Sequence, residues 1–585
     1  MLRRRDRLDN AAPLVVAVVE PRLLDVAAAG SSPIGEIFRR HGTVTAKQLD
    51  SALQTQEVEG KLLGDILLAK GVPAAAVTRA LAEQSGLTTI DLRTVDPQPE
   101  ALALVPAGLA RRRGVLPLSS SDGTLQVAIS DPFDAELVIE LEQLPVARVN
   151  LVLAEREALV DLINLRYSEL DSVGTLVTAY ADTAPSSDGP RRRIQVDEAA
   201  PVAQVLSKIV SQALRDRASD VHIEPLDDRL RVRFRIDGAL NEVLTLPAEM
   251  GAPLVSRIKI LAEMNIVERR RPQDGQFATT VDGRDLDVRV ATTATIFGEK
   301  AVLRLLDKSR SMRTITDLGM PTEAYARYEA ATRAPYGMVL VTGPTGSGKT
   351  TTLYATLRQL NRGEINIMTI EDPVEYVFPG VNQIEINNQA DVTFATGLKS
   401  ILRQDPDVIL VGEVRDQETA RIAIQSALTG HMVLSSLHAV DCTSSLFRLL
   451  DMGIEPFLVT SAITGIVAQR LVRKVCNSCA APYAPTASEL AFYKQFEGPA
   501  SPVFMAGTGC TFCSNTGYRE RVGVYEVMNL NEEIRQAVIA GVSPRDVRDL
   551  AIKTGMRSLR SEALDLIAHG VTTVAEVLRT VHMTS

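Results

Sequence analysis

Residues 336–350 read Tyr-Gly-Met-Val-Leu-Val-Thr-Gly-Pro-Thr-Gly-Ser-Gly-Lys-Thr, and the fold is best inferred outward from this stretch. Met338 to Val341 is an apolar run long enough for a buried strand, and the residues from Leu353 onward read as a helix. A G-x-x-x-x-G-K-T pattern between a strand and a helix predicts a phosphate-binding loop. The alternative is a glycine-rich turn that binds nothing.

The chemistry of the loop follows from its residue types. Its glycines allow positive φ angles, so several backbone N–H groups can point inward at one anion, and the helix that follows adds the positive end of its dipole. Lys349 would supply a charge for the β- and γ-phosphates, and the Thr350 hydroxyl would bind Mg²⁺. The predicted nucleotide-binding residues are Gly343, Pro344, Thr345, Gly346, Ser347, Gly348, Lys349, Thr350 and Thr351.

Length and composition limit the class of protein. The chain has 585 residues, too many for one hydrophobic core, so we expect several domains. With 45% hydrophobic and 23% charged residues, no apolar run of bilayer length and no signal peptide, it reads as a cytoplasmic protein or one held at a membrane by a partner. The net charge of −9 argues against a chain built mainly to bind nucleic acid.

Two segments precede the first mixed domain. Residues 1–30 begin with several arginines and are predicted to be a flexible extension. Residues 31–90 repeat one pattern, which starts at Ile34-Gly35 and again at Leu63-Gly64. Each copy reads as a short helix, a glycine stop and a second amphipathic helix, which predicts a small helical domain. A docking module without a ligand is the alternative.

Two α+β domains are predicted next. Residues 91–168 contain a hairpin, and residues 169–195 are rich in Ser, Thr, Asp, Gly and Pro, which predicts a flexible linker. In the domain at residues 196–310, the strand at 230–236 alternates arginine with apolar residues and so presents a row of cations on one face. The row could be a solvated sheet face, or some of its arginines could reach a phosphate.

Three further apolar runs end in residues that suit a nucleotide site. They are 365–370, followed by Glu371; 408–411, followed by Gly412-Glu413; and 432–437, which lies between His431 and His438. Carboxylates at the carboxyl ends of parallel strands lie beside the ligand crevice. Glu413 stands where such enzymes place the acid that orients the water shell of the metal or the attacking water. The order of these segments after a complete phosphate loop predicts one site.

Four of the five cysteines form two C-x-x-C pairs, Cys476 with Cys479 and Cys510 with Cys513. Four thiolates in two pairs predict a closed, structural Zn²⁺ site, and a redox dithiol is the alternative. Cys442 is predicted to pack as a small apolar residue.

These segments together resemble the secretion and pilus-assembly ATPase superfamily. Residues 343–350, 369–376, 402–416 and 429–438 look like its phosphate loop, Asp box, Walker B motif and His box. The resemblance is to the GspE/PilB branch, which drives type II secretion and type IV pilus extension, and it covers most of residues 196–585. The repeat at residues 31–90 resembles the duplicated N-terminal module of the same ATPases.

The resemblance implies a homohexamer that hydrolyses ATP, and it implies roles for single residues. Glu371 would be the general base or orient the water and Glu413 would help to place the metal, and the two tasks could be exchanged. Arg289 and Arg304 resemble the arginines that swing onto the γ-phosphate when two lobes close, with Arg235 and Arg257 as further candidates. The histidines 431 and 438 would sense the γ-phosphate; the alternative is a satisfied polar residue near a strand end.

The resemblance also implies the fold class: multidomain α/β, with a RecA-like P-loop NTPase core, a preceding α+β (PAS-like) domain, a zinc-binding insert and helical N- and C-terminal modules. The predicted divisions are an extension at 1–30, helical repeat at 31–90, α+β domain at 91–168, linker at 169–195, arginine-bearing α+β domain at 196–310, ATPase core at 311–470, zinc insert at 471–530 and helical C-terminal domain at 531–585.

The implied cofactors are ATP, Mg²⁺ and Zn²⁺, and the implied partners are an inner-membrane platform protein and a cytoplasmic adaptor, so the protein would be cytoplasmic and peripheral to the inner membrane. Some relatives bind cyclic di-GMP through an Arg-Leu-Gly start to each repeat. Pro33 and Leu62 stand at those arginine positions, so cyclic di-GMP is a secondary hypothesis. The exported filament could be a pilus or a pseudopilus.

Two other functions remain as alternatives to a motor. A nucleic-acid translocase on the same engine would show ATPase stimulation by single-stranded DNA, and the acidic balance argues against it. A non-hydrolysing scaffold or nucleotide sensor would bind ATP without releasing phosphate, and the presence of Glu371 and Glu413 argues against it.

Overall fold

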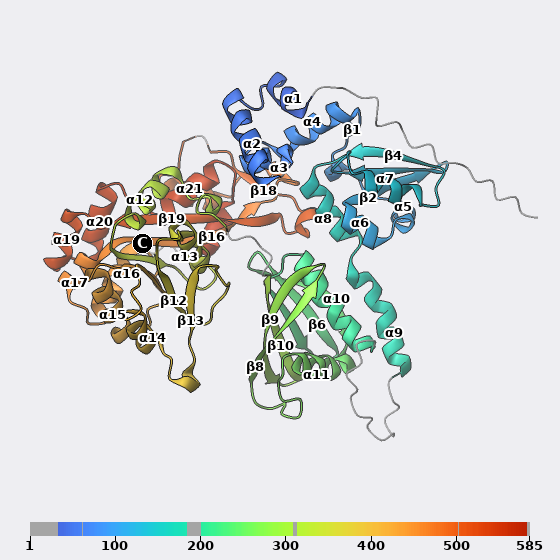
Figure 1. The fold of residues 1–585 in the computed structure, drawn as a ribbon. Coiled ribbons are helices and arrows are strands. Elements are labelled where there is room, and N and C mark those ends of the chain that lie inside the picture. The colour runs from blue at the N-terminus through green and yellow to red at the C-terminus, as the bar shows by residue number, and fades with distance from the viewer. Residues whose placement is uncertain (1–32, 61, 184–199, 308–312, 501, 582–585) are drawn as a thin grey trace, which may run out of the picture. The chain divides into compact units, whose positions relative to one another are not determined.

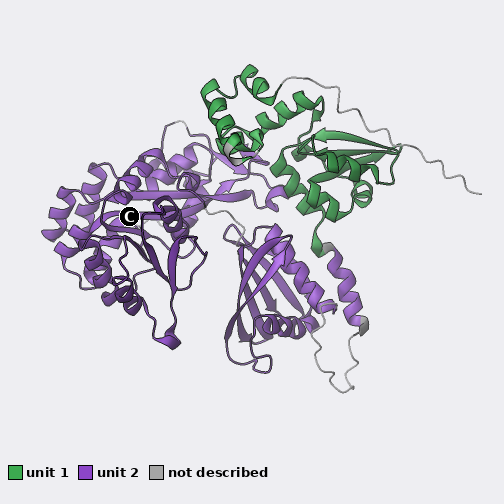
Figure 2. Cartoon of the chain, viewed as in Figure 1, with its two compact units in different colours: residues 1–171 green, residues 172–585 purple. Residues whose placement is uncertain are grey.

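The computed structural model describes residues 33–60, 62–183, 200–307, 313–500 and 502–581, and the extension expected at residues 1–30 lies outside them. The chain divides into two units, residues 1–171 and residues 172–585, shown in green and purple in Figure 2. Within the described part of the chain, each helix is too short or too polar to cross a bilayer.

The first unit begins with the predicted helical repeat (Figure 1). Its helices are α1 (Ile34–Arg40), α2 (Ala46–Glu59), α3 (Leu63–Ala69) and α4 (Ala74–Ser85), and they share one hydrophobic core. A Cβ on Gly35 would lie 3.3 Å from Leu49, and a Cβ on Gly64 would lie 3.3 Å from Val77. The repeated glycine is therefore the point where the first helix of each copy approaches the second.

A four-stranded sheet of order β1-β4-β3-β2 completes the first unit. Its elements are β1 (Thr88–Thr89), α5 (Pro99–Leu104), α6 (Ala107–Arg113), β2 (Val115–Ser121), β3 (Thr124–Ile129), α7 (Ala135–Glu142), β4 (Arg148–Leu153) and α8 (Arg156–Arg166). The predicted hairpin is confirmed as β2 and β3, which pair antiparallel. Strand β4, which was not predicted, runs parallel to both β3 and β1.

A helix stands where the first part of the linker was predicted. The predicted linker at 169–195 is wrong for its first part, because a short 3₁₀ turn at Glu169–Ser172 leads into helix α9 (Val173–Thr183). Helix α9 packs against α10 (Pro201–Arg215), and Val173 is buried. Its apolar residues lie among the Ser, Thr and Asp that suggested a linker, and packing against α10 outweighs that local composition. Residues 184–195 lie outside the described residues.

An antiparallel six-stranded sheet of order β7-β6-β5-β10-β9-β8 follows. Its elements are β5 (Asp220–Pro225), β6 (Arg229–Ile236), β7 (Ala239–Pro247), α11 (Gly251–Leu261), β8 (Gln273–Val281), β9 (Arg284–Thr295) and β10 (Gly298–Asp307). The predicted alternation along β6 is confirmed, since its apolar residues up to Phe234 are buried and the arginines between them are half-buried.

Buried acids compensate the arginine row. Glu224 on β5 accepts hydrogen bonds from Arg231 at 2.9 Å and Arg233 at 2.8 Å, and Lys300 lies 2.9 Å away. Burial alone would raise the pKa of Glu224, but the hydrogen bonds from these three cations lower it to about 2. These arginines therefore hold the sheet together, which neither of the two sequence interpretations had proposed.

The third sheet has seven strands in the order β13-β12-β14-β15-β11-β16-β19, parallel throughout except that β19 runs antiparallel to β16. The strands are β11 (Gly337–Thr342), β12 (Ile367–Glu371), β13 (Val381–Glu385), β14 (Val408–Val411), β15 (Met432–Leu437), β16 (Ile463–Val475) and β19 (Tyr518–Asn529). The strands predicted at 338–341, 365–370, 408–411 and 432–437 are confirmed to within two residues.

Helices cover both faces of this sheet, as a parallel sheet requires. They are α12 (Thr322–Thr332), α13 (Lys349–Leu360), α14 (Phe394–Ile401), α15 (Gln417–Leu428), α16 (Cys442–Asp451) and α17 (Pro456–Ala462). Alternate residues of β11 belong to different cores: Met338 and Leu340 pack in one cluster, and Val339 and Val341 pack in another.

The last part of the chain confirms the predicted helices and corrects two domain limits. The helices are α19 (Glu532–Ile539), α20 (Pro544–Lys553), α21 (Leu559–Ala568) and α22 (Val574–Thr580), and they pack in the same core as one face of the sheet. Because β16 and β19 are sheet strands, the segment inserted between them is 476–517 and not 471–530. This segment contains β17 (Ala480–Pro482), α18 (Ala487–Gln495) and β18 (Met505–Gly507).

The Glu224 cluster leads to a prediction for stability. In Glu224→Gln, three cations lose their shared anion, and we expect the six-stranded sheet to lose roughly 2 kcal/mol of stability. Hydrogen–deuterium exchange over residues 220–307 measures the change. Since the pKa of Glu224 is depressed in the folded chain, its contribution is complete above the ordinary glutamate pKa and is lost as the pH falls toward 2. Glu242→Gln, at an exposed position on β7, is the matched control, and equal exchange in both variants would contradict the prediction.

Candidate functional site

The predicted phosphate loop connects β11 to α13. Gly343, Gly346 and Gly348 have φ angles of 152°, 77° and 87°, a region that L side chains rarely adopt. A Cβ on Gly343 would also lie 2.5 Å from the Ser347 hydroxyl oxygen. Backbone conformation therefore favours glycine at all three positions, and at Gly343 space requires it as well.

The polar groups of the loop are placed for an anion. The Lys349 ammonium donates to the carbonyl oxygens of Gly343 at 2.9 Å and Pro344 at 3.1 Å. Burial lowers the pKa of Lys349, and the nearby Glu413 carboxylate acts in the opposite direction. The Ser347 hydroxyl oxygen is buried and has no hydrogen-bond partner among the described residues, and Thr350 is exposed at the start of α13. An ammonium bound only to carbonyls and an unpaired hydroxyl both suit a phosphate with its metal ion.

Glu371 is the last residue of β12 and is only 3% exposed. Its carboxylate accepts hydrogen bonds from the hydroxyl groups of Tyr354 and Thr369, the latter at 2.6 Å, and from the Gln383 amide at 3.2 Å. Burial raises the pKa of the Tyr354 phenol, so this hydroxyl remains a donor. This buried carboxylate is bound by three hydrogen-bond donors, and such contacts are those of a residue that holds its neighbours in place.

Glu375 has a different environment and was not singled out from the sequence. Its side chain is 30% exposed, and one carboxylate oxygen lies 3.7 Å from the Arg289 guanidinium. Its backbone N–H donates to the Tyr354 hydroxyl at 3.2 Å, so the buried Glu371–Tyr354 pair supports the segment that carries Glu375. The sequence signal that could have identified Glu375 is its position as the second glutamate of the Glu-Asp-Pro-Val-Glu stretch.

Glu413 follows β14 and is held by two basic side chains. His438 Nε2 lies 3.2 Å from one carboxylate oxygen, and the Arg415 guanidinium contacts the other. Arg415 also reaches Asp372 at 3.4 Å, and the bond to Glu413 is the main cause that raises the pKa of Arg415. The predicted Walker B acid, the Asp box and one histidine are therefore joined by direct contacts.

The structure does not bring the two predicted histidines together. Thr342 is level with Leu437 in the register of β11 and β15, so His438 lies beside the phosphate loop. His431 precedes the same strand, roughly 20 Å away at ~3.3 Å per residue, and its Nδ1 lies 2.9 Å from the Ser426 carbonyl oxygen. Strand direction thus separates His431 from the loop of its own chain, and its contacts are those of a satisfied polar residue.

The arginines predicted to reach phosphate lie on one cross-strand row. In register, Arg289 is opposite Arg304, Arg304 is opposite Asp220, and Asp220 is opposite Arg235. Asp220 pairs with Arg304 at 3.1 Å and with Arg235 at 3.6 Å. Arg257 is half-buried on α11 and is not part of this row.

Arg289 connects this sheet with the Asp box. Its guanidinium donates to the Val374 carbonyl oxygen at 3.1 Å. A pocket of about 530 Å³ beside it is lined by Arg289, Arg304 and Pro373 among others, a volume typical of small-ligand sites. Arg289 and Arg304 therefore border one space, next to the segment that carries Glu375.

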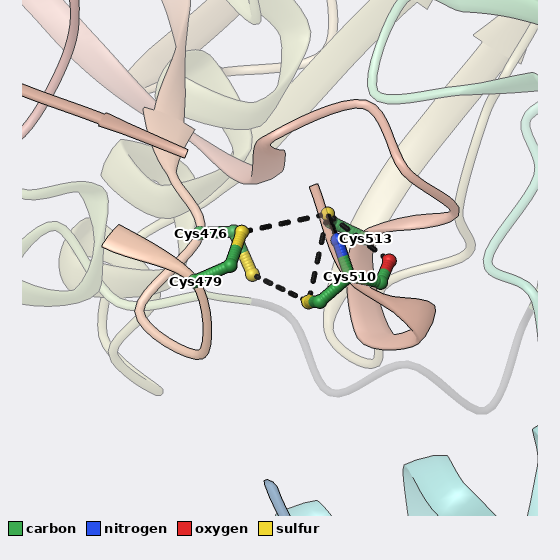
Figure 3. Close-up of side chains that lie close together, drawn as sticks. All are labelled: Cys476, Cys479, Cys510 and Cys513. Carbon is green, nitrogen blue, oxygen red and sulfur yellow. Dashed lines mark hydrogen bonds between the residues drawn. The ribbon is translucent and has the colours of Figure 1, made fainter. Parts of the chain in front are cut away.

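The four predicted metal-ligating cysteines lie together (Figure 3), with all sulfur atoms within 4.8 Å of one another. Cys476 and Cys510 are 3.8 Å apart, Cys479 and Cys513 are 3.8 Å apart, and Cys510 and Cys513 are 3.7 Å apart. Sulfur atoms bound tetrahedrally at ~2.3 Å from zinc lie about 3.8 Å from one another, so the arrangement fits that metal.

Backbone amides surround one of the sulfur atoms. Cys513 Sγ accepts the N–H of Gly517 at 3.2 Å and of Cys510 at 3.3 Å. Burial raises the pKa of the Cys513 thiol, but these backbone hydrogen bonds outweigh burial and leave the pKa below its usual value. Amide donors therefore favour the thiolate, the form that binds a metal. Cys442 is buried elsewhere in the core, as predicted.

A P-loop nucleotide hydrolase is the class of protein that this fold and site define. Residues 195–579 match the family described as Type II/IV secretion system protein, and residues 85–173 match the MshEN domain. The chain belongs to the type II/IV secretion family and is one of its ATPases.

Relatives of similar length show the same family. The chain is 39% identical over 94% of its length to the Type IV pilus assembly ATPase PilB of Myxococcus xanthus, covering 98% of that protein. It is 41% identical over 85% of its length to the Type II secretion system protein E of Xanthomonas campestris pv. campestris, covering 89% of it. A solved structure titled "Structure of MshE with cdg" covers 23% of this chain and 99% of its own, with 33% identity and a TM-score of 0.22.

Proposed function

We propose that this chain is a hexameric cytoplasmic motor that couples ATP hydrolysis to the assembly of a type IV pilus or of the pseudopilus of type II secretion. The observation that carries the proposal is the contact of Arg289 with the Val374 carbonyl oxygen. It joins the arginine-bearing sheet to the segment after β12, whose acids are the candidates for the chemistry. Loss of the γ-phosphate beside this contact would change the position of the arginine-bearing sheet relative to the core. A motor needs such a movement that depends on the nucleotide.

The phosphate loop would hold ATP, and Thr350 would bind Mg²⁺. The backbone amides of the loop would face the phosphates, with Lys349 placed to neutralise their charge. Bound Mg²⁺ would offset negative charge on the β- and γ-oxygens. Glu413, between His438 and Arg415, would order the metal's water ligands, and Arg289 and Arg304 would approach the γ-phosphate.

We assign the water-orienting carboxylate to Glu375 and the support of that segment to Glu371. A general base must reach the attacking water, and the 30% exposed Glu375 side chain is accessible whereas Glu371 is only 3% exposed and bound by three donors. For Glu413 and the arginines we propose the roles that the sequence predicted.

For the fold we propose a RecA-like core at the seven-stranded sheet and a PAS-like domain at the six-stranded sheet. Strand order supports the first, since β11 lies inside a parallel sheet with the candidate acids following β12 and β14. The predicted domain divisions stand as proposals, with the limits of the linker and the insert corrected above.

We propose that the four cysteines hold Zn²⁺ and that the ion is structural. All four tetrahedral positions would be filled by sulfur, so no position remains for water or substrate. The residues themselves would join the ends of β16 and β19, because Cys476 directly follows β16 and Cys513 precedes β19 by five residues.

The partners we propose are an inner-membrane platform protein and a cytoplasmic adaptor, which would place the motor at the inner membrane. The helical repeat is the proposed docking module. Cyclic di-GMP is not part of the proposal, because Pro33 and Leu62, which immediately precede α1 and α3, offer no guanidinium for a phosphate.

Lys349→Ala tests the motor proposal. We expect phosphate release to fall to background while the chain stays folded, because the half-buried ammonium binds only two carbonyl oxygens of the loop. Phosphate release by the assembled protein with Mg²⁺ is the measurement, and a circular dichroism melt checks folding. Full turnover in the variant would refute the site, and stimulation of the unmodified chain by single-stranded DNA would favour a translocase.

Glu375→Gln and Glu371→Gln separate the two carboxylates. For Glu375→Gln we expect turnover to fall by ~100-fold or more, with ATP still bound and the melting temperature unchanged. For Glu371→Gln we expect a lower melting temperature with measurable turnover, because an amide NH₂ would then face a hydroxyl donor. The reverse pattern would return the water-orienting task to Glu371.

Cys479→Ser tests the metal proposal. We expect bound zinc to fall from a single ion per chain to none and residues 476–517 to lose hydrogen-exchange protection, because metal binding contributes directly to folding. Elemental analysis of the purified chain measures the metal. Cys442→Ala changes a cysteine outside the cluster and is expected to keep the zinc. Zinc retained in Cys479→Ser, or absent from the unmodified chain, would contradict the assignment.

A further inference from the structure

A glutamine on β16 lies next to the phosphate loop. The last residue pair of β11 and β16 is Thr342 with Ala468, so the next residue of β16, Gln469, is level with Gly343 at the start of the loop. Gln469 is 1% exposed, although it stands in a strand whose neighbouring residues are mainly apolar. A fully buried amide needs its hydrogen bonds satisfied, and the partners it uses show what it holds in place.

Both ends of the amide bind the loop and its helix. Nε2 donates to the Ser347 carbonyl oxygen at 2.6 Å, and Oε1 accepts from the Thr352 hydroxyl at 2.8 Å. Gln469 also lies close to two loop glycines: a Cβ on Gly343 would lie 2.6 Å from its carbonyl oxygen, and a Cβ on Gly348 would lie 3.0 Å from its Nε2. Two of the loop glycines therefore make room for this residue.

The bond to Ser347 has a consequence for the phosphate. In a planar trans peptide the C=O and the following N–H point in opposite directions. When the Ser347 carbonyl is held toward Gln469, the N–H of Gly348 must point away from Gln469. Gln469 thus fixes the direction of a donor that the bound phosphate would use.

The next residue adds a charge. Arg470 is 6% exposed and donates to the carbonyl oxygens of Gln469 at 2.9 Å and Val440 at 2.6 Å. Among the described residues no carboxylate lies within ion-pair distance of this guanidinium, although Glu526 and Asp441 act on it through longer-range charge interactions. Burial is the main cause that lowers the pKa of Lys349, and the charge of Arg470 lowers it further. Val440 lies two residues beyond His438, so Arg470 also holds the segment that follows β15.

We propose that Gln469 and Arg470 are positioning residues of the phosphate site: Gln469 orients the loop amides, and Arg470 places a buried positive charge behind them. This inference rests on the proposed function, since it assigns the loop to a nucleotide. It goes beyond that function because it predicts that nucleotide affinity depends on two residues of a strand outside the recognised motifs.

Gln469→Glu is the decisive variant. It keeps an acceptor for Thr352 but replaces the donor to Ser347 by a carboxylate oxygen, which repels the carbonyl. We expect the Kd of Mg-ADP to rise about tenfold or more, the loss expected when a buried hydrogen bond is replaced by a repulsive contact. Gln469→Met, which removes both polar ends at similar volume, is expected to have the same effect. Titration calorimetry of the full chain gives the Kd.

Thr464→Val is the matched control. Thr464 lies on the same strand at its other end, and its hydroxyl donates to the Met338 carbonyl oxygen at 3.2 Å. We expect this variant to lower the melting temperature, because it also loses a hydrogen bond of β16, but to keep the affinity of the unmodified chain. The proposal would be overturned if Thr464→Val weakened Mg-ADP binding as the Gln469 variants do, or if both Gln469 variants bound Mg-ADP with unchanged affinity.

Arg470 is tested by charge. We expect Arg470→Met to weaken Mg-ADP binding and Arg470→Lys to restore most of it, because only the second keeps the positive charge. Equal affinity in the two Arg470 variants would overturn the role of the charge. Binding of Mg-ADP requires no turnover, so a chain that binds it but releases no phosphate from ATP would refute the proposed function and leave this proposal intact. A chain that binds no nucleotide would overturn both.

Discussion

The common direction of the parallel strands is the constraint on which the site depends. Because β11, β12, β14 and β15 run the same way, the residues that follow them meet at one edge of the sheet. The phosphate loop, the Asp-box acids, Glu413 and His438 reach that edge for this reason alone. The same constraint places His431 at the opposite edge, although in sequence it is as close to β15 as His438 is. Sequence proximity to a strand therefore does not identify a site residue until the strand direction is known.

Compensation of buried charge is the second constraint, and it decides which arginines are available. Glu224 engages Arg231, Arg233 and Lys300, and Asp220 engages Arg304 and Arg235. An arginine shared with a buried carboxylate must give up that contact before it binds a phosphate, which costs free energy. Arg289 contacts a backbone carbonyl and the half-buried Glu375. Of the arginines in the row, it would therefore lose the least interaction free energy when it binds a phosphate.

Much of this arrangement follows from local sequence, and some of it does not. The loop, its strand and the cysteine pairs were predictable because glycine conformation and thiolate spacing are local properties. Helix α9 was missed because packing against α10 outweighs a linker-like composition. Glu371 and Glu375 could not be distinguished from sequence. What distinguishes them is that Tyr354 and Gln383 bind Glu371, and neither of these two side chains is its neighbour in the chain. The only sequence signal of Gln469 was a polar residue in a mainly apolar strand, and such a residue has many possible structural explanations.

Strand β16 connects these constraints into one mechanical unit. It holds the phosphate loop through Gln469, and seven residues later it reaches Cys476 of the four-cysteine cluster. Between them Arg473 binds the buried Glu576 of α22 at 2.7 Å, and β16 pairs with β19 along this stretch, with a register shift between Arg473 and Val475. A strand held near its far end by a buried ion pair, and by the proposed metal site, resists sliding, so the position of the Gln469 amide is set by more than its own hydrogen bonds. The cysteine cluster and the phosphate loop thus lie at two ends of one pair of strands, so order at the cluster supports the geometry at the loop.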